Sequence, residues 1–528
     1  MSRPVTSVHA VVWREIRTST LVVTVLVAGV IEVGLRSFVA SGGATGMAGL
    51  APLVRNSAVA ALYGRVASLD NGGVFVVWRL GTFLLLTVAV WAALCATRVT
   101  RAGEDDGSWD VLVLGRRRRA AVLRTTTLVL AEAGTVVGVA STLVMLAGAQ
   151  TPRGSLYFGL GVVAVAWSGA VIGLLAAQVA APRRSASQAC LVVIILAFFL
   201  RVIADAGASS EWLRDATFFG WVEKVGAFQP SDAKALLLAL AAPVLVAGVV
   251  WWLQHFRDVG GALFTHADSS APRRFLLGSS WTFAWRERSS VWRWWTIGLA
   301  AFGAILGYLT HSLVSLAQTD PSYVALLDRF GFGEMVTAVG FIALSSVVMS
   351  VAFAILVISW ISSAASDEVK GRLEVAFATG PRRATWLVSV VASALLAVTC
   401  VAATTTLAMW AGVRISGTSM SLLTVIEAVG STLAIVPFIV GGTLLLVARA
   451  PRVAFAVGAV YVLVTYVVQA LGPILKWPAF LLQIEPFHYL RGVPTQPFDL
   501  GGLTWISLVG VVVGVVGLWL YVRRDVAG

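Results

Sequence analysis

Lysine is scarce in this sequence of 528 residues, which contains only Lys224, Lys234, Lys370 and Lys476. None of these lysines follows a glycine. A P-loop ATPase needs the sequence Gly-Lys-Ser/Thr, because its lysine reaches the β- and γ-phosphates from a cradle of backbone amides. The chain is therefore not expected to hydrolyse ATP by itself, and no enzyme activity is predicted for it.

Cysteine and histidine are also rare. The three cysteines, Cys95, Cys190 and Cys400, lie inside apolar runs, and their pattern indicates neither a disulfide framework nor a thiolate metal site. The five histidines show no spacing typical of metal ligands. The sequence predicts no metal site in this chain.

Charged residues make up only 12% of the chain, whereas a soluble domain averages about 25%. Apolar runs of about 20 residues recur along the whole length, and their continuity indicates helices rather than strands. We therefore expect an all-α polytopic membrane protein with twelve transmembrane helices. The expected spans lie near residues 18–38, 74–97, 121–149, 156–180, 187–205, 233–254, 293–317, 337–364, 383–412, 421–448, 453–472 and 501–522.

The distribution of charge predicts the orientation. Arginine and lysine concentrate in the amino-terminal segment, in the loops after the even-numbered spans and at the carboxyl terminus. The positive-inside rule makes this side cytoplasmic, so both termini are expected in the cytoplasm and the protein in the cell (plasma) membrane. The sequence pI of about 10.4 then reflects contact with anionic membrane lipids, and no nucleic-acid partner is predicted.

Short motifs recur in the same order in the two halves of the chain. The loop RAGEDDGSWDVLVLGRRRR at 101–119 matches SDEVKGRLEVAFATGPRR at 366–383, with Glu104 on Glu368. Trp-Arg-Glu at 13–15 recurs at 285–287, and Arg-Asp-Val at 257–259 recurs at 524–526. Each half holds an even number of spans, so the repeats are parallel. The expected domains are a first six-span half at 1–262, a cytoplasmic linker at 263–279 and a second six-span half at 280–528.

Each repeated loop has the pattern of a short amphipathic helix. Trp109, Leu112 and Val113 share one helical face, acids crowd the amino end and arginines follow the carboxyl end, which suits the helix dipole. Two equivalent helices of this kind predict two equivalent partners. The alternative is that the arginines only obey the positive-inside rule and the acids only solvate the loop.

In its order of motifs the chain resembles the permease subunits of bacterial ABC exporters, most closely the fused twelve-span type of actinobacterial polyketide (tetronasin-type) antibiotic exporters, with type V architecture. The resemblance implies that the two loops are cytoplasmic coupling helices, and that two copies of a separate ATPase subunit bind ATP and Mg²⁺. The implied coupling residues are Glu104, Asp105, Asp106, Gly107, Trp109, Asp110, Leu112, Val113, Asp367, Glu368, Gly371, Leu373, Glu374 and Phe377.

The resemblance also implies amphipathic elbow helices at Val5–Arg17 and Trp281–Arg293, and short re-entrant helices within Glu211–Phe228 and Trp477–Tyr489. It places a cavity for amphipathic drugs or lipid-like products between the second and fifth spans of both halves. Aromatic and methionine side chains suit such substrates. The implied cavity residues are Trp78, Phe83, Trp91, Glu132, Phe198, Phe199, Phe341, Met349, Phe353, Tyr461 and Tyr466.

An ion-coupled secondary transporter is the main alternative, because ionisable residues inside spans are functional candidates. Arg79, Arg201 and Glu427 lie near the outer ends of their spans and are expected to reach toward water. Glu132 is then the acid expected well inside the membrane, and it would carry the coupling ion. A membrane enzyme acting on lipid-linked substrates is a third class, but no nucleophile–base pair is recognisable.

Overall fold

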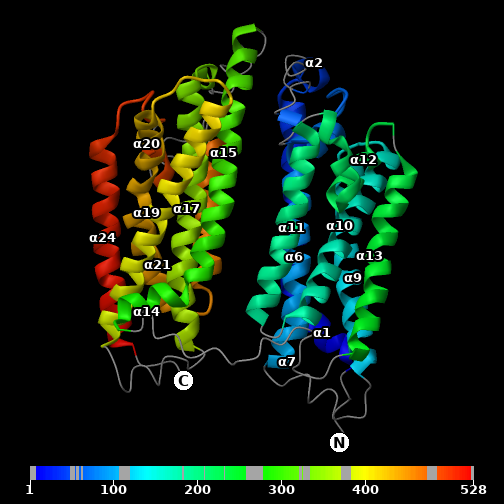
Figure 1. The fold of residues 1–528 in the computed structure, drawn as a ribbon, viewed down its shortest axis with the longest axis horizontal. Coiled ribbons are helices and arrows are strands. Elements are labelled where there is room, and N and C mark those ends of the chain that lie inside the picture. The colour runs from blue at the N-terminus through cyan, green and yellow to red at the C-terminus, as the bar shows by residue number, and fades with distance from the viewer. Residues whose placement is uncertain are drawn as a thin grey trace, which may run out of the picture. The chain divides into compact units, whose positions relative to one another are not determined.

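The computed structural model describes residues 7–47, 54, 59–60, 63–105, 119–180, 183–206, 208–230, 232–256, 278–319, 321, 324, 333–369, 382–471, 485–490 and 492–524. The described residues form helices and connecting segments, without a β-strand. The chain divides into two compact units, Met1–Ser270 and Ala271–Gly528 (Figure 1). Each unit is a bundle of long helices with its own interior.

The described residues of the first unit form six long helices and several shorter ones. The long helices are α1 (Val8–Ala40), α6 (Thr82–Thr97), α9 (Arg119–Ala147), α10 (Pro152–Val179), α11 (Arg183–Ala206) and α13 (Ala233–Leu253). The shorter ones are α2 (Gly43–Met47), α5 (Gly72–Val76), η2 (Val77–Gly81), η3 (Arg98–Ala102), α7 (Gly103–Asp105), η4 (Ala208–Ala216), α12 (Phe218–Val225) and η5 (Gln254–Phe256). The second expected span is thus a helix in which the α-helical segments are joined by π-helical turns at η2 and η3.

The second unit is also a bundle of helices. Its long helices are α15 (Ser289–Thr319), α17 (Ala338–Val369), α19 (Arg383–Ile415), α20 (Leu422–Ser431), α21 (Val436–Arg449), α22 (Ala454–Leu471) and α24 (Leu500–Arg523). Its short helices are α14 (Ser280–Glu287), η6 (Gly333–Val336), η7 (Thr432–Ile435) and η8 (Pro486–Tyr489). The 3-10 turn η7 joins α20 to α21, so these three elements make one span.

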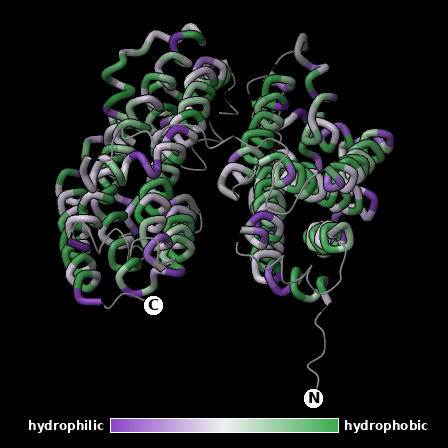
Figure 2. The backbone as a smooth tube through the Cα atoms, turned by 60° about the horizontal axis from the view of Figure 1, so that its bottom comes forward, coloured by the Kyte–Doolittle hydropathy of each residue, from purple (hydrophilic) through white to green (hydrophobic). Residues whose placement is uncertain are grey.

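Eleven helical stretches within the described residues are long and apolar enough to cross a bilayer. They correspond to all the expected spans except the one at 453–472, where α22 forms but its apolar stretch, Ala454–Tyr466, is shorter. Hydrophobic residues run along the helices of both units (Figure 2). Many large apolar side chains are exposed on the helix surfaces, such as Leu245 and Trp505, which suits contact with lipid. The chain is a multi-pass membrane protein.

Small residues let the helices of each unit approach closely. A side chain at Gly169 of α10 would place its Cβ 2.3 Å from the carbonyl oxygen of Ala89 on α6. In the second unit, a Cβ at Gly441 of α21 would lie 2.0 Å from the carbonyl oxygen of Gly510 on α24. Such contacts are typical of helix pairs in membranes, where close backbone packing replaces the hydrophobic effect.

The two expected elbow helices differ. In the second unit α14 is a separate helix, begun by a capping box at Ser279, and Arg288 ends it before α15 starts. In the first unit the described part of the expected elbow, from Val8 onward, is continuous with the first span as α1. In the first unit, therefore, the described residues of the expected elbow do not form a helix separate from the first span.

Candidate functional site

The residues of the expected coupling loops are described only at the start of each loop. Glu104 and Asp105 end the helical stretch that continues α6, and Asp367 and Glu368 lie in the last turn of α17. The other expected coupling residues lie outside the described residues. They are Asp106, Gly107, Trp109, Asp110, Leu112, Val113, Gly371, Leu373, Glu374 and Phe377.

Arg101 connects the start of the first loop to the fourth span. Its Nη1 donates to Glu104 Oε2 at 2.9 Å, and its Nε donates to the carbonyl oxygen of Ala177 at 2.6 Å. The side chains of Arg101 and Glu104 are only 1% and 8% exposed. Ala177 lies in the last turn of α10, where carbonyl groups lack helical partners and the helix dipole favours a cation. The guanidinium therefore holds the loop start against the end of α10.

Arg524 makes the corresponding connection in the second unit. Its Nη2 donates to Glu368 Oε1 at 2.9 Å, and its Nη1 donates to the carbonyl oxygen of Val447 at 2.9 Å. Val447 lies in the last turn of α21. Glu368 is buried, with a side chain 2% exposed. Arg383, the first residue of α19, donates to the carbonyl oxygen of Arg524 at 2.8 Å and fixes the arginine from the other side.

The two units thus make the same kind of contact at the loop start, with arginines from different positions in the chain. We call the pairs Arg101–Glu104 and Arg524–Glu368 the loop clamps. In both, a glutamate that begins the repeated loop pairs with an arginine that also caps the fourth span of its unit. Arginine suits this role because its planar fork can donate to a carboxylate and a carbonyl together. The carboxylates of Glu104 and Glu368 therefore each have an arginine partner within their own unit.

Other ion pairs connect the amino-terminal helices to the same region. In the second unit Arg288, which is buried between α14 and α15, lies 3.6 Å from Asp367 and 3.0 Å from Glu287. In the first unit Arg98 lies 3.4 Å from Glu15 of α1, and both side chains are well exposed. In each unit an ion pair thus joins the region of the loop start to the amino-terminal helices. These pairs are partly buried in the second unit and exposed in the first.

The residues expected to line a substrate cavity have several different environments. Trp78 and Phe198 line one small cavity in the first unit. Phe341, Met349 and Phe353 are buried inside the second unit, and Trp91 packs on the apolar cluster near the loop end of the first. Phe83 and Tyr461 are exposed, while Phe199 and Tyr466 are half-buried.

A buried ion cluster includes Glu223 of α12, and α12 lies at the opposite end of the first unit from α7, which carries Glu104 (Figure 1). Arg201 Nε lies 2.8 Å from Asp205 and 2.9 Å from Glu223, and Arg214 Nε donates to Asp205 at 2.7 Å. The expectation that Arg201 reaches toward water is wrong, because its side chain is 4% exposed and is held by these two acids. The spacing of Arg201 and Asp205, four residues apart on a helix, was a signal for this pair.

Glu132 has a partner within the first unit. Its Oε2 lies 2.8 Å from His9 Nε2, and both side chains are about half exposed. His9 is in the first turn of α1, so Glu132 lies near the amino-terminal end of the first span. It is therefore not an isolated acid at the centre of a helix bundle.

Comparison with known proteins agrees with this architecture. Residues 277–522 match the family described as "Multidrug efflux system permease Rv1217c, C-terminal domain". Over 483 residues the chain is 27% identical to the multidrug efflux system permease protein Rv1217c of Mycobacterium tuberculosis, covering 91% of this chain and 87% of that protein. The chain is similar to multidrug efflux permeases. The similarity and the eleven apolar helices together support a membrane permease.

Proposed function

We propose that this chain is the transmembrane permease subunit of an ATP-driven ABC exporter. It moves amphipathic small molecules, such as antibiotics, drugs or lipid-like compounds, out of the cytoplasm or the inner leaflet by alternating access. Its similarity to a multidrug efflux permease across nearly the whole chain supports export. Because no lysine follows a glycine, ATP and Mg²⁺ are assigned to two copies of a separate ATPase subunit.

The observation that carries this proposal is the pair of loop clamps. When a partner moves one of these loops, the movement must be transmitted to the spans. A rigid attachment between the start of the loop and a span can transmit it. Arg101 and Arg524 attach the loop starts to the fourth spans by short, charge-assisted hydrogen bonds that are at least partly buried. Movement of either loop would then shift the second and fourth spans of its unit together.

The loop clamps also change the expected roles of the coupling residues. Glu104 and Glu368 are buried partners of arginines, so we assign them to positioning the loops. Contact with the ATPase is assigned to the apolar positions further along, such as Leu112 and Leu373. Reversing the charge of Glu104 or Glu368 would disturb the unit itself and would not test docking.

The test of docking is the native mass of the complex extracted from its own membrane. We expect one chain with two ATPase subunits, and loss of both subunits from the double variant Leu112→Asp with Leu373→Asp. The matched control is Leu263→Asp, the same substitution in the expected linker. A wild-type complex without ATPase subunits, or a double variant that retains them, would contradict the proposal.

Ion-coupled transport is the second candidate, since Glu132 and His9 are two ionisable groups in contact at 2.8 Å. The energy source separates the two functions. In inverted vesicles, an ATP-driven exporter accumulates a dye such as Nile red only with ATP and is stopped by vanadate. A proton-coupled transporter is stopped by nigericin and by Glu132→Gln, and it works without ATP.

A further inference from the structure

A short motif, Gln-Pro-x-Asp, precedes the sixth span in both units. It reads Gln-Pro-Ser-Asp at 229–232 and Gln-Pro-Phe-Asp at 496–499. The aspartate begins the helix that follows, because the side chains of Asp232 and Asp499 accept hydrogen bonds from backbone N–H groups in the first turns of α13 and α24. Capping therefore accounts for the aspartate of the motif but not for the glutamine.

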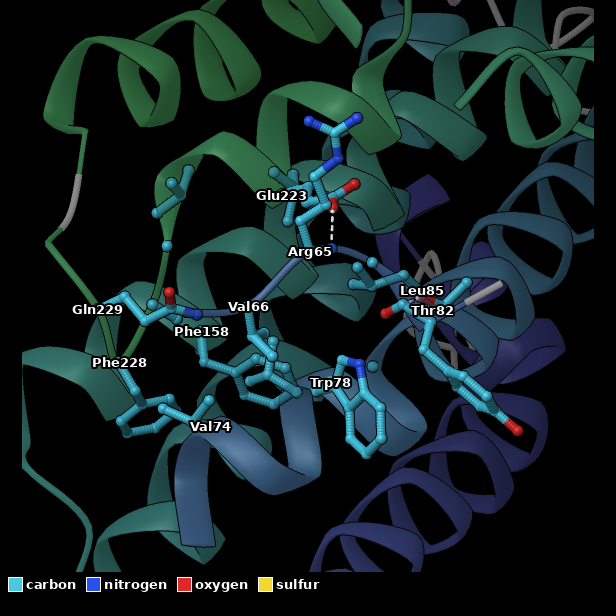
Figure 3. A pocket seen from close by; sticks show the side chains of 18 of the residues that line it. Arg65, Val66, Val74, Trp78, Thr82, Leu85, Phe158, Glu223, Phe228 and Gln229 are labelled. Carbon is cyan, nitrogen blue, oxygen red and sulfur yellow. Dashed lines mark hydrogen bonds between the residues drawn. The ribbon is translucent and has the colours of Figure 1, made fainter. Parts of the chain in front are cut away.

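In the first unit this glutamine joins the start of the sixth span to the segment 63–67, which leads into the second span. Gln229 Oε1 accepts a hydrogen bond of 3.2 Å from the backbone N–H of Ala67. Glu223 of α12 accepts one of 3.0 Å from the backbone N–H of Arg65, drawn as a dashed line in Figure 3. We call these two contacts the first span latch.

In the second unit the equivalent glutamine makes an equivalent connection. Gln496 Nε2 donates to Glu334 Oε1 at 2.7 Å, and Thr495 Oγ1 donates to Glu334 Oε2 at 2.7 Å. Glu334 lies in η6, shortly before α17, which is the second span of this unit. We call these two contacts the second span latch. The partner of the glutamine is a backbone N–H group in one unit and a carboxylate in the other, but the same two spans are joined.

The span latches lie at the other end of the second spans from the loop clamps. Glu334 precedes α17 and Glu368 lies in its last turn, while Ala67 precedes α5 and Glu104 follows α6. Exposure differs in the same way, because Ala67 and Glu334 are exposed, whereas the side chains of Glu104 and Glu368 are only 8% and 2% exposed. Water replaces the partners of an exposed hydrogen bond when it breaks, but not those of a buried one. The latches are therefore suited to opening and the clamps to staying closed.

We propose that the span latches hold the second and sixth spans of each unit together while the transport path is closed at this end, and that they open each time a substrate is released. This end is the one expected outside the cell. Movement of a repeated loop reaches the second span through its loop clamp, and the far end of that span then separates from the sixth. Gln229 and Gln496 are positioning residues, since they act on the spans and not on the substrate. The proposal rests on the proposed function and deepens it by naming contacts that break in each cycle.

Locking the second span latch with a cross-link tests the proposal. Glu334→Cys and Gln496→Cys are combined in a chain whose three native cysteines are replaced by alanine. The chain is purified with any subunits that stay bound, treated with a bismethanethiosulfonate reagent and reconstituted into vesicles. We expect the cross-link to stop Nile red transport, because a latch that cannot open blocks release, and dithiothreitol to restore it. The same reagent on Leu500→Cys with Thr504→Cys, one turn apart on α24, should leave transport unchanged.

The energy source separates failure of the latch from failure of the exporter. Transport is measured once with ATP and once with an imposed proton gradient. ATP-driven transport that continues with the latch cross-linked would refute the latch and leave the exporter standing. Transport that needs the proton gradient and stops on cross-linking would refute the exporter and support the latch.

Hydrogen exchange of the wild-type complex tests the first span latch and needs no variant to fold. The backbone N–H groups of Arg65 and Ala67 are the donors of this latch, so their exchange rates report its opening. With ATP and vanadate we expect exchange in the peptide 63–69 to become about five-fold faster, the size of one hydrogen bond. The backbone N–H of Gly73, which donates to Gln150 Oε1 at 2.7 Å outside the latch, is the matched control and should not change.

The outcomes of the exchange experiment are also distinct. Unchanged exchange in the peptide 63–69, with faster exchange elsewhere in the chain, would refute the latch. No response to ATP and vanadate anywhere in the chain would refute ATP-driven export, and the cross-link under a proton gradient then decides the latch.

Discussion

Arg524 Nη2 lies 2.9 Å from Glu368 Oε1, across 156 positions of sequence. This contact joins the end of the last helix to the end of α17, and its counterpart Arg101–Glu104 spans three positions. The two units therefore hold equivalent glutamates with arginines from different places. Both loop starts have an arginine–glutamate contact, but the two arginines come from different positions in their units.

Replacing Arg524 tests the second loop clamp. Arg524→Met leaves the buried Glu368 without its cation, and we expect a loss of about 3–5 kcal/mol in unfolding free energy. The loss is measured by thermal or denaturant unfolding of the purified chain in nanodiscs. Arg523→Met is the neighbouring control, since Arg523 is exposed and contacts only the ring of Trp519, 4.0 Å away, among the interactions described. A double variant, Arg524→Met with Glu368→Leu, should recover part of the stability; equal losses in the single and double variants would contradict the clamp.

Arg101 and Arg98 form a matched pair in the first unit. Arg101→Met breaks a buried ion pair and is expected to cost about 3–5 kcal/mol, whereas Arg98→Met breaks an exposed one and is expected to cost about 0–1 kcal/mol. Unfolding in nanodiscs compares the two. Similar small effects would show that the Arg101–Glu104 clamp does not support the unit.

Close helix contact in the first unit is tested at Gly169. Gly169→Ala places a methyl group 2.3 Å from the carbonyl oxygen of Ala89 and should separate α6 from α10, at a cost of about 1–3 kcal/mol. Gly29→Ala is the control, because a Cβ there meets no atom within 4 Å and the better helix former should stabilise α1 slightly. Unfolding midpoints that fall equally for both variants would refute close packing at Gly169.

Glu485 predicts a pH dependence of stability. Its carboxyl is buried before η8, and burial raises its pKa to about 8 from an ordinary 4.5. The folded state then binds this proton more tightly than the unfolded state, so its contribution to stability falls as pH rises from about 4.5 to about 8. Glu485→Gln, which stays neutral, should raise the unfolding midpoint at pH 9 and leave it unchanged at pH 4.5. The same difference at both pH values would show that Glu485 does not titrate as expected.

Much of the fold could be predicted from hydropathy alone. A span must be continuous and apolar for about 20 residues, so eleven of the expected spans coincide with long helices of the structure. The expected span at 453–472 is less clear, because the apolar part of α22 ends at Tyr466. The first elbow was not predictable from its motif, since Trp13-Arg14-Glu15 continues α1 while Trp285-Arg286-Glu287 ends α14.

The candidate site could be predicted less well. The repeat identified Glu104 and Glu368 as equivalent, but it suggested that both face a partner. The structure buries them against Arg101 and Arg524, and no pattern in the sequence links Arg524 to Glu368. Trp78 and Phe198 were both expected at a cavity, yet their shared small cavity depends on the turn at η2 and on the segment 63–67.

By itself, the sequence determined that this chain crosses the membrane many times, that its halves share motifs and that it lacks the lysine of a P-loop. These properties follow from local composition and spacing, which are read directly along the chain. Only the tertiary structure decided which arginine holds which glutamate, and that the buried indole N–H of Trp78 has no acceptor among the described residues. Those outcomes depend on side chains that meet from distant segments, and a buried charge or N–H group is stable only where the whole fold supplies its partner.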